Sequence, residues 1–393
     1  MYRRSRGSWR RLILAASLPL LFSIFRSDSA YAFPDVAFTG SADAAGVDVS
    51  LVLVPAVLAV DIDVARQHAD LAGAANTPVS TSGRGDGIDV AVVIGSLAGA
   101  AVDIVNASSN KTYDGNSSPV TDADSLVNVD TLLVDTGIIG TNTSSQVTGT
   151  LADSFGQNGV NGLSVYRNSL GTLNLVTANT ITSTVQSQTN TVGPNHDVVS
   201  TSSARIEGAA VSLGPLLGLT DPVVTADLIQ ANASATNDGT VTDMNAAASV
   251  SFVNLMVNGV NLSAAPPNTV VNLLVLGVPV ARVTVRPIIG TTITQNLSTA
   301  RTVALRIEVL AVAGLVGTTI DLGVANAAAA VGNTFNGNSG PLALALTGFA
   351  ASVTPPGGLA LPLSLGMAVA VLPTVIVVLR RRGRKGWKPA VQG

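Results

Sequence analysis

The acidic segment from residue 113 to residue 125 contains the groups best suited to metal chemistry. It runs Tyr113-Asp114-Gly115-Asn116-Ser117-Ser118 and continues as Thr121-Asp122-Ala123-Asp124-Ser125. Calcium prefers carboxylate and other oxygen ligands. The segment lacks the glutamate at the twelfth position that completes an EF-hand loop. We therefore predict a solvated acidic loop, with a calcium site formed by Asp114, Asp122 and Asp124 as the alternative hypothesis. No other cofactor is predicted.

Catalytic residue types are scarce and poorly placed in the sequence. The two histidines, His68 and His196, are far apart, whereas a histidine-based zinc site needs a second ligand close by. The absence of cysteine excludes disulfides, thiolate metal sites and cysteine nucleophiles. No Gly-x-Ser-x-Gly elbow occurs, although a Ser-His-Asp triad is defined by its geometry and stays open. We predict no catalytic residues, and a hydrolase with an aspartate-based site remains an alternative.

Aromatic residues are also rare between residues 33 and 358. Both tryptophans, Trp9 and Trp387, lie outside that interval, and aromatic residues make up 4% of the chain. Carbohydrate platforms and tight protein interfaces use Trp and Tyr as anchors. Binding by this interval would therefore depend on extended shape, backbone edges or charge.

Charge is distributed unevenly along the chain. Of the 21 basic residues, 12 lie before residue 27 or after residue 379. The interval 33–355 keeps 9 Lys/Arg against 23 Asp/Glu, which gives it a net charge of −14. A surface of that sign repels phosphate groups, so we predict no nucleic-acid partner.

The first 32 residues have the order of a secretory signal peptide. Five arginines precede the apolar run 12–25, and Ala30 and Ala32 follow two positions apart. A basic start, a short apolar segment and an Ala-x-Ala site are typical of a cleaved export signal. Residues 1–32 are therefore predicted as a signal peptide, with Sec and twin-arginine export both open.

A second apolar stretch lies near the other end of the chain. Residues 359–379 carry no charge, and a basic tail follows directly at 380–393. About 20 apolar residues span a bilayer as a helix, and the Lys/Arg cluster stays on the cytoplasmic side. We predict a single-pass protein of the cell membrane, with residues 33–358 extracellular and 380–393 cytoplasmic.

The interval between the two ends has the pattern of an all-β ectodomain. Apolar residues alternate with polar ones along 47–53, 281–286 and 303–310, as in strands with one buried side. Arg282 or Arg286 is placed to pair across strands with Glu308. Irregular spacing and hairpin signals favour an antiparallel β-sandwich, with a β-solenoid as the alternative.

Polar and glycine-rich stretches predict turns and boundaries. Asn258-Gly259 and Asn237-Asp238-Gly239 predict hairpins, while Gly87 and Gly115 predict further turns. Arg84-Gly85-Asp86 is the tripeptide that integrins bind on exposed loops, with an ordinary turn as the alternative. The polar stretch Gln188–Ser203 predicts a boundary between a β-rich region at 33–195 and a β domain at 200–328, and 329–358 is predicted as a stalk.

The region 200–328 resembles a known family of bacterial surface proteins. The resemblance follows this series of segments: Ala209–Leu219, Val223–Ala235, Ser251–Gly259, Pro266-Pro267-Asn268-Thr269, Ala304-Leu305-Arg306-Ile307 and Gly323–Ala327. The order is similar to that of the choice-of-anchor P proteins, in which similar ectodomains carry different C-terminal anchors. The phrase Phe252–Gly259 is its most specific part, and the chain departs from the family after the Pro-Asn-Thr segment. The resemblance implies export and anchoring and supplies no site residues.

These observations together predict an exported, membrane-anchored bacterial surface protein with a structural or adhesive, non-catalytic role. The predicted partners are the membrane, through residues 359–379, and an unidentified extracellular or cell-envelope ligand. Two alternatives stay open, a secreted-side hydrolase with an aspartate-based site and a calcium-stabilised surface spacer.

Overall fold

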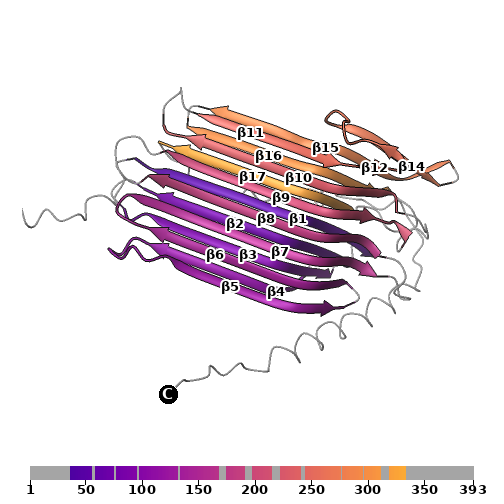
Figure 1. Ribbon diagram of the computed structural model, residues 1–393, viewed down its shortest axis with the longest axis horizontal. Coiled ribbons are helices and arrows are strands. Elements are labelled where there is room, and N and C mark those ends of the chain that lie inside the picture. Colours follow the sequence, from indigo (N-terminus) through magenta and orange to yellow (C-terminus); the bar gives the residue numbers. More distant parts are fainter. Residues whose placement is uncertain are drawn as a thin grey trace, which may run out of the picture.

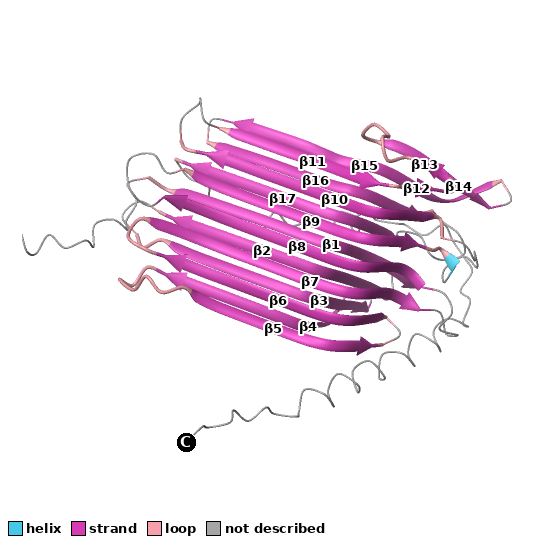
Figure 2. Cartoon of the chain, viewed as in Figure 1, coloured by secondary structure: helices cyan, strands magenta, loops and turns pink. Residues whose placement is uncertain are grey.

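The computed structural model describes the interval 36–332, apart from residues 55–57, 75–76, 95–96, 132, 168–173, 191–196, 215–221, 240–243, 276, 295 and 311–317. Its regular structure is almost entirely β-strand (Figure 2). Within those ranges, no helix has the length and apolar character of a membrane span. The predicted signal peptide 1–32, membrane helix 359–379 and basic tail 380–393 lie outside the described residues.

Two large antiparallel sheets contain all the strands of the described residues, which confirms the all-β prediction. Sheet A has eight strands in this order: β14 (Thr269–Val275), β15 (Val278–Thr294), β16 (Leu297–Val309), β17 (Thr319–Val331), β1 (Phe38–Val54), β2 (Leu58–Gly73), β3 (Ser80–Ile94) and β4 (Leu97–Thr112). Sheet B has nine, in this order: β13 (Val260–Asn261), β12 (Met256–Val257), β10 (Val224–Asn237), β9 (Val198–Val211), β8 (Asn174–Asn190), β7 (Leu151–Arg167), β6 (Val134–Val147) and β5 (Val120–Asp130), with β11 (Asn245–Val253) also paired to β10.

The chain traces these sheets as a meander that returns to its start. β1 to β4 build half of sheet A, β5 to β13 build sheet B, and β14 to β17 complete sheet A, where β17 pairs with β1. The stretch Gln188–Ser203, which was predicted to separate two domains, runs from the end of β8 into β9. These two strands are neighbours in sheet B. The stretch therefore does not separate two independently folded parts, because both predicted regions contribute strands to both sheets.

The two sheets pack face to face with their strands running in nearly the same direction (Figure 1). Every strand pair is antiparallel, so the sandwich prediction holds and the solenoid alternative does not. Most strands have 13 to 17 residues, against about 5–6 in ordinary sheets. The buried core lies between the sheets and contains one large cluster of Val, Ile, Leu and Ala side chains.

Along a strand, every second residue faces the core. Halfway along the strands this alternation shifts by one residue, so that the other set of residues faces the core. On β1 the inward residues are Ala42 and Ala44 before the change, and Val47 and Val49 after it. The change coincides with mid-strand residues of positive φ on five strands: Ala65 on β2, Gly162 on β7, Gly208 on β9, Arg286 on β15 and Gly323 on β17. The pairing register is the same on both sides of the residues on β2, β7, β9 and β17, so neighbouring strands change parity together. On β15 the change lies at a register shift between Val285 and Ile288, which is a β-bulge.

This row of positive-φ residues divides the core into two halves of different composition. The half that we call the small-residue half is rich in Gly, Ala, Ser and Thr; in sheet A it comprises the inward residues of 38–44, 67–73, 80–85, 298–302 and 325–331, and in sheet B those of 141–147, 152–158, 183–189, 198–204 and 231–237. The aliphatic half contains Val, Ile and Leu at 47–51, 60–64, 305–309 and 320–322 of sheet A, against 163–165, 175–178, 209–213 and 223–226 of sheet B.

Where the two halves of the core meet, a row of aliphatic side chains of sheet B packs against glycines of sheet A. Neighbouring strands β6 to β10 align Ile139, Val160, Ile181, Ile206 and Ile229, all fully buried. A methyl group at Gly87 would overlap Ile139, and one at Gly46 would overlap Ile181. The expected turn at Gly87 is therefore wrong, because this glycine lies within β3 and makes room for the opposite sheet.

The other local predictions fared unevenly. Asn258 and Gly259 have φ of 48° and 78° and connect β12 to β13, which confirms that hairpin. Arg282 pairs with Glu308 across β15 and β16 at 3.6 Å. The integrin-type tripeptide lies within β3 instead of on a loop, because Arg84, Gly85 and Asp86 continue the pairing of β2 with β3.

Candidate functional site

The outer face of sheet A carries a row of charged and amide residues in the small-residue half. The strands β16, β17, β1, β2 and β3 bring five residues into register, which we call the His68 row: Arg301, Asn326, Asp43, His68 and Arg84. They face away from sheet B because their neighbours Ala42, Ala44 and Ala69 pack inward against Val185. A row of this kind depends on strand register, since its members are scattered over 284 positions of the sequence, from 43 to 326.

The His68 imidazole is held between two carboxylates. Its Nδ1 lies 2.6 Å from Asp43 Oδ1, and its Nε2 contacts a carboxylate oxygen of Asp70 on the same strand. Burial would lower the pKa of His68, but the hydrogen bonds and negative charges of Asp43 and Asp70 outweigh it and raise the pKa to about 10. At neutral pH both ring nitrogens therefore carry protons, which they donate to the two carboxylates.

This geometry does not provide general-base catalysis. A general base works best when its pKa is close to the operating pH, and it needs a free ring nitrogen. Ser41 lies directly across from Asp70, and its Oγ has no hydrogen-bond partner. Because both nitrogens of His68 are occupied by carboxylates, neither can remove a proton from Ser41. The cluster contains the residue types of a Ser-His-Asp triad in an arrangement that cannot work as one.

Beside this ion cluster, the row has polar groups with unused hydrogen-bonding capacity. Asn326 is 1% exposed, and neither its Oδ1 nor its Nδ2 has a partner. Asp43 Oδ2 and Arg301 Nε are likewise buried without one. Buried polar groups are nearly always hydrogen-bonded, because leaving them unpaired is costly. The row therefore contains donors and acceptors that are buried side by side without a hydrogen-bond partner among the described residues.

A second row on the same face crosses the aliphatic half and consists of aspartates. Adjacent strands β17, β1, β2 and β3 place in register Asp321, Asp48, Asp63 and Asp89. Arg306 neutralises Asp321 through two hydrogen bonds of 2.8 and 2.6 Å, and Arg66 pairs with Asp63 at 2.7 Å. Burial and the flanking Asp63 and Asp321 raise the pKa of Asp48 well above its ordinary value.

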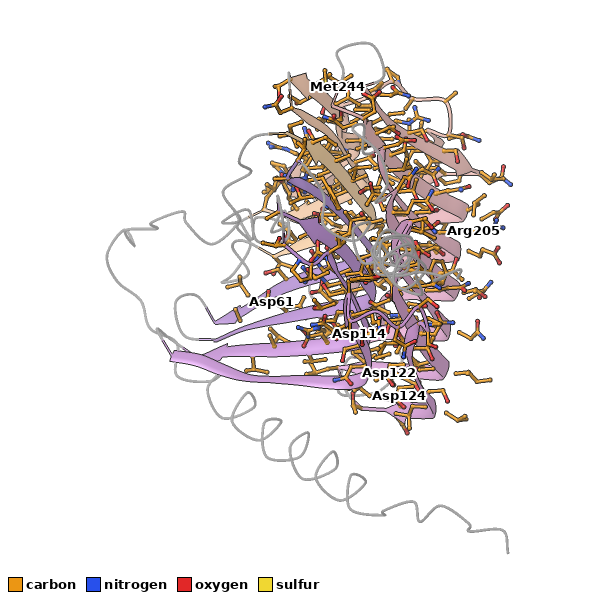
Figure 3. The ribbon with its side chains drawn as sticks, turned by 90° about the vertical axis from the view of Figure 1, so that its left-hand side faces the viewer. Asp61, Asp114, Asp122, Asp124, Arg205 and Met244 are labelled. Atoms are coloured by element: carbon orange, nitrogen blue, oxygen red, sulfur yellow. The ribbon has the colours of Figure 1, made fainter. Side chains whose placement is uncertain are left out.

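The outer face of sheet B has a different character. Registered rows of hydroxyl and amide side chains cross it, as in Asn142, Gln157, Thr184, Ser203 and Asn232 on β6 to β10. The charged residues Arg205 and Glu207 form a pair at 2.6 Å. A shallow hollow of about 280 Å³ lies on this face; its lining includes Thr184, Thr201, Ser203, Asn232, Ser234 and Ser249. Asp61 and Arg205 mark the two opposite outer faces in Figure 3.

The three aspartates of the calcium hypothesis each make contacts of their own. Asp114 lies in the turn between β4 and β5, where it pairs with Lys111 Nζ at 3.0 Å and accepts the Asn116 N–H. Asp122 accepts the Ser108 N–H at 2.8 Å, whereas Asp124 accepts that of Ser125 (Figure 3). Within the described ranges, no group of three or more Asp, Glu or His residues is arranged to hold a metal ion.

Sequence reasoning considered His68 and missed its partners. His196, the other histidine, lies outside the described residues. The hairpin of β1 and β2 aligns Asp43 with His68, and the alternation along β2 puts Asp70 on the same face. A predicted hairpin between those strands would have suggested this pair. Nothing local links them to Asn326 or Arg301, which arrive from the end of the chain through the pairing of β1 with β17.

No family model and no curated protein matches the chain.

Proposed function

We propose that this protein is an exported, membrane-anchored surface protein with a structural or adhesive, non-catalytic role. The observation that carries the proposal is the state of its richest ionisable cluster. His68, Asp43 and Asp70 bind one another on a sheet face, and Arg306 and Asp321 do the same in the second row. Charges that neutralise one another stabilise a surface, whereas a catalytic site keeps at least one group available to the substrate.

The shape of the described sandwich supports the same role. Long strands give each sheet a broad outer face, and the face of sheet B presents repeated hydroxyl and amide groups instead of a deep pocket. Such a face can make many weak contacts with an extended ligand. The predicted export signal and membrane helix place this face outside the cell, and the resemblance to choice-of-anchor P proteins supports the same location.

Protease treatment of intact cells that express the full chain tests the location. Mass spectrometry of the released and retained peptides should find peptides from 36–332 released and peptides from 380–393 retained. Protection of 36–332 on cells whose outer surface is open to protease would contradict the proposal. Protease treatment of lysed cells is the control, because it must cut both regions.

Comparison of cells with and without the displayed chain tests the role. We expect the displayed chain to increase cell aggregation or attachment to a surface, and the Asp43→Asn variant to retain that increase. If cells with and without the chain aggregate and attach equally, the adhesive role is wrong. If Asp43→Asn abolishes the effect at unchanged display level, the His68 row itself binds the ligand, and a purely structural role for it is wrong.

A further inference from the structure

The second half of β15 is an edge strand with one open side. β16 pairs with β15 along its length, as far as Thr294 opposite Leu297. On the other side, β14 pairs with β15 only from Val278 to Val285. No other described strand pairs with residues 286–294 on that side, so sheet A ends there in a free edge (Figure 1).

The side chains of this edge are exposed on both faces of the sheet. All six residues from Ile289 to Thr294 are exposed, whereas a strand within the sandwich buries every second residue. Ile289 is 38% exposed and Ile293 is 50% exposed. β11 of sheet B lies near β15 but leaves the side chains of 289–294 exposed.

Arg286, Pro287 and a bulge lie at the start of the open edge, whereas residues 289–294 lack the devices by which proteins prevent strand pairing. Charged side chains, prolines and bulges usually protect an edge strand. The edge strand of sheet B, β5, follows that rule with three exposed aspartates, Asp122, Asp124 and Asp130. The sequence from Ile289 to Thr294 reads Ile-Gly-Thr-Thr-Ile-Thr and has no charge and no proline. The irregular pairing near Pro287 lies before this segment.

The segment is complementary to a second copy of itself. When two such strands pair in antiparallel orientation about Thr291, Ile289 of each copy lies opposite Ile293 of the other, and the two Thr291 residues face each other. Pairs of β-branched side chains are favourable across antiparallel strands. A two-fold axis through this pair relates the copies, as in most protein dimers.

We propose that the β15 edge, residues 289–294, is a self-association site at which two copies of this chain join their A sheets into one continuous sheet. The pairing uses the unsatisfied backbone N–H and C=O groups of the edge for affinity and the isoleucines for register. It does not depend on where the protein is located in the cell, so its test is independent of the test of the proposed function.

A single cysteine provides a direct test, because the chain contains none. In an antiparallel pair, facing Cα atoms lie about 4.5–5.5 Å apart, which a disulfide spans. The full chain with Thr291→Cys, purified in detergent and oxidised mildly, should form a covalent dimer on a non-reducing gel. The Thr184→Cys variant, with its cysteine on the outer face of sheet B, should remain monomeric and serves as the control.

Two further experiments test the register of the proposed pair and the effect of a charge on the edge. A mixture of Ile289→Cys and Ile293→Cys chains should give more dimer than either variant alone, because those positions face each other only across the proposed pair. Adding Ile293→Lys to Thr291→Cys should abolish the dimer, since it brings charge to the exposed edge. Circular dichroism should show unchanged β content in each variant.

Three outcomes would overturn the proposal. Thr291→Cys chains that stay monomeric while folded would show that the edge does not pair with itself. Equal dimer from Thr184→Cys would show random collision. Cross-linking of Thr291→Cys in cells to a different protein, with no homodimer there or in detergent, would assign the edge to another partner.

Discussion

The two halves of the sandwich lie on either side of the row of positive-φ residues, and they fill the space between the sheets with different side chains. In the aliphatic half, residues such as Leu51, Ile62 and Leu322 are fully buried and fill the space between the sheets. In the small-residue half, Gly40 lies so close to β8 and β9 that a methyl group there would overlap Ser187 and contact Ser200. The first half is held by apolar burial and the second by close approach.

Polar contacts between the sheets accompany that close approach. Gln67 Nε2 donates a hydrogen bond to Thr141 Oγ1 at 2.9 Å. Ser154 Oγ donates to the Ser82 carbonyl oxygen at 2.5 Å, and Asn158 Nδ2 donates to the Asp86 carbonyl oxygen at 2.7 Å. Other buried hydroxyls of this half have no partner, for example those of Ser183 and Thr302. Burial of a hydroxyl group without a partner costs free energy. From this difference in side-chain size and polarity, we infer that the aliphatic half supplies most of the stability. The small-residue half determines how closely and in which position the two sheets pack.

The largest effect should come from the aliphatic row at the division. Ile181→Ala removes a fully buried side chain that lies over Gly46, and it should cost about 2–5 kcal/mol of unfolding free energy. Denaturant unfolding of the full chain measures the loss. Thr182→Ala, on the outward side of the same strand, is the matched control and should change stability by less than about 0.5 kcal/mol. A loss below that limit for Ile181→Ala would show that the aliphatic half does not dominate.

A glycine on the opposite side of that contact should have a smaller effect. Gly46→Ala places a methyl group against Ile181 and should cost about 1–3 kcal/mol by overpacking. Gly140→Ala is the control, because no atom lies within 4 Å of its added methyl group. Combining Gly46→Ala with Ile181→Ala should cost less than the sum of the two, since the smaller side chain frees the space. Strict additivity would contradict the contact.

Two threonines of the small-residue half should respond in opposite directions. Thr141→Val leaves the amide of Gln67 unpaired and should cost about 1–3 kcal/mol. Thr302→Val removes a buried hydroxyl without a partner and should stabilise the fold by about 1 kcal/mol. The same unfolding measurement compares them. Destabilisation by both variants would show that the hydroxyl of Thr302 contributes to the fold after all.

The two outer rows should make stability depend on pH in the same direction. The raised pKa of His68, about 10 in the folded state against 6.5 as its ordinary value, contributes stability that is complete below pH 6.5 and is lost as the pH rises through about 10. The raised pKa of Asp48 contributes stability below pH 3.8 that is lost as the pH rises through its folded-state pKa. The melting temperature should therefore fall as the solution becomes alkaline.

Two variants separate these contributions. His68→Gln should flatten the dependence between pH 6.5 and 10, because the residue no longer gains a proton on folding. Asp48→Asn should raise the melting temperature at pH 7, since a neutral amide then faces Asp63 and Asp321, and this gain should shrink below pH 4. A pH profile of Asp48→Asn that coincides with that of the parent chain would show that the aspartate row is fully neutralised.

Much of the secondary structure could be predicted from the sequence because its causes are local. Alternation predicted the strands around 47–53, 281–286 and 303–310, and Asn258-Gly259 predicted a hairpin whose positive φ angles are present. Glycine was the least reliable signal. Gly115 lies in a turn with φ of 82°, whereas Gly87 lies within a strand, where the opposite sheet needs the space. The requirement at Gly87 comes from Ile139, 52 positions away, and no local pattern reports it.

By itself, the sequence determined which segments form strands, that the chain is acidic between its basic ends, and that cysteine chemistry is excluded. Alternation, turn residues and charge depend on neighbours a few positions apart. The tertiary structure alone decided that Asp43, His68, Asn326 and Arg301 share one row, that four aspartates share another, and that the β15 edge stays open. These features depend on strand register and on the order of strands in a sheet. Both are set by packing between residues as far apart as Phe38 and Val331, whose pairing closes sheet A.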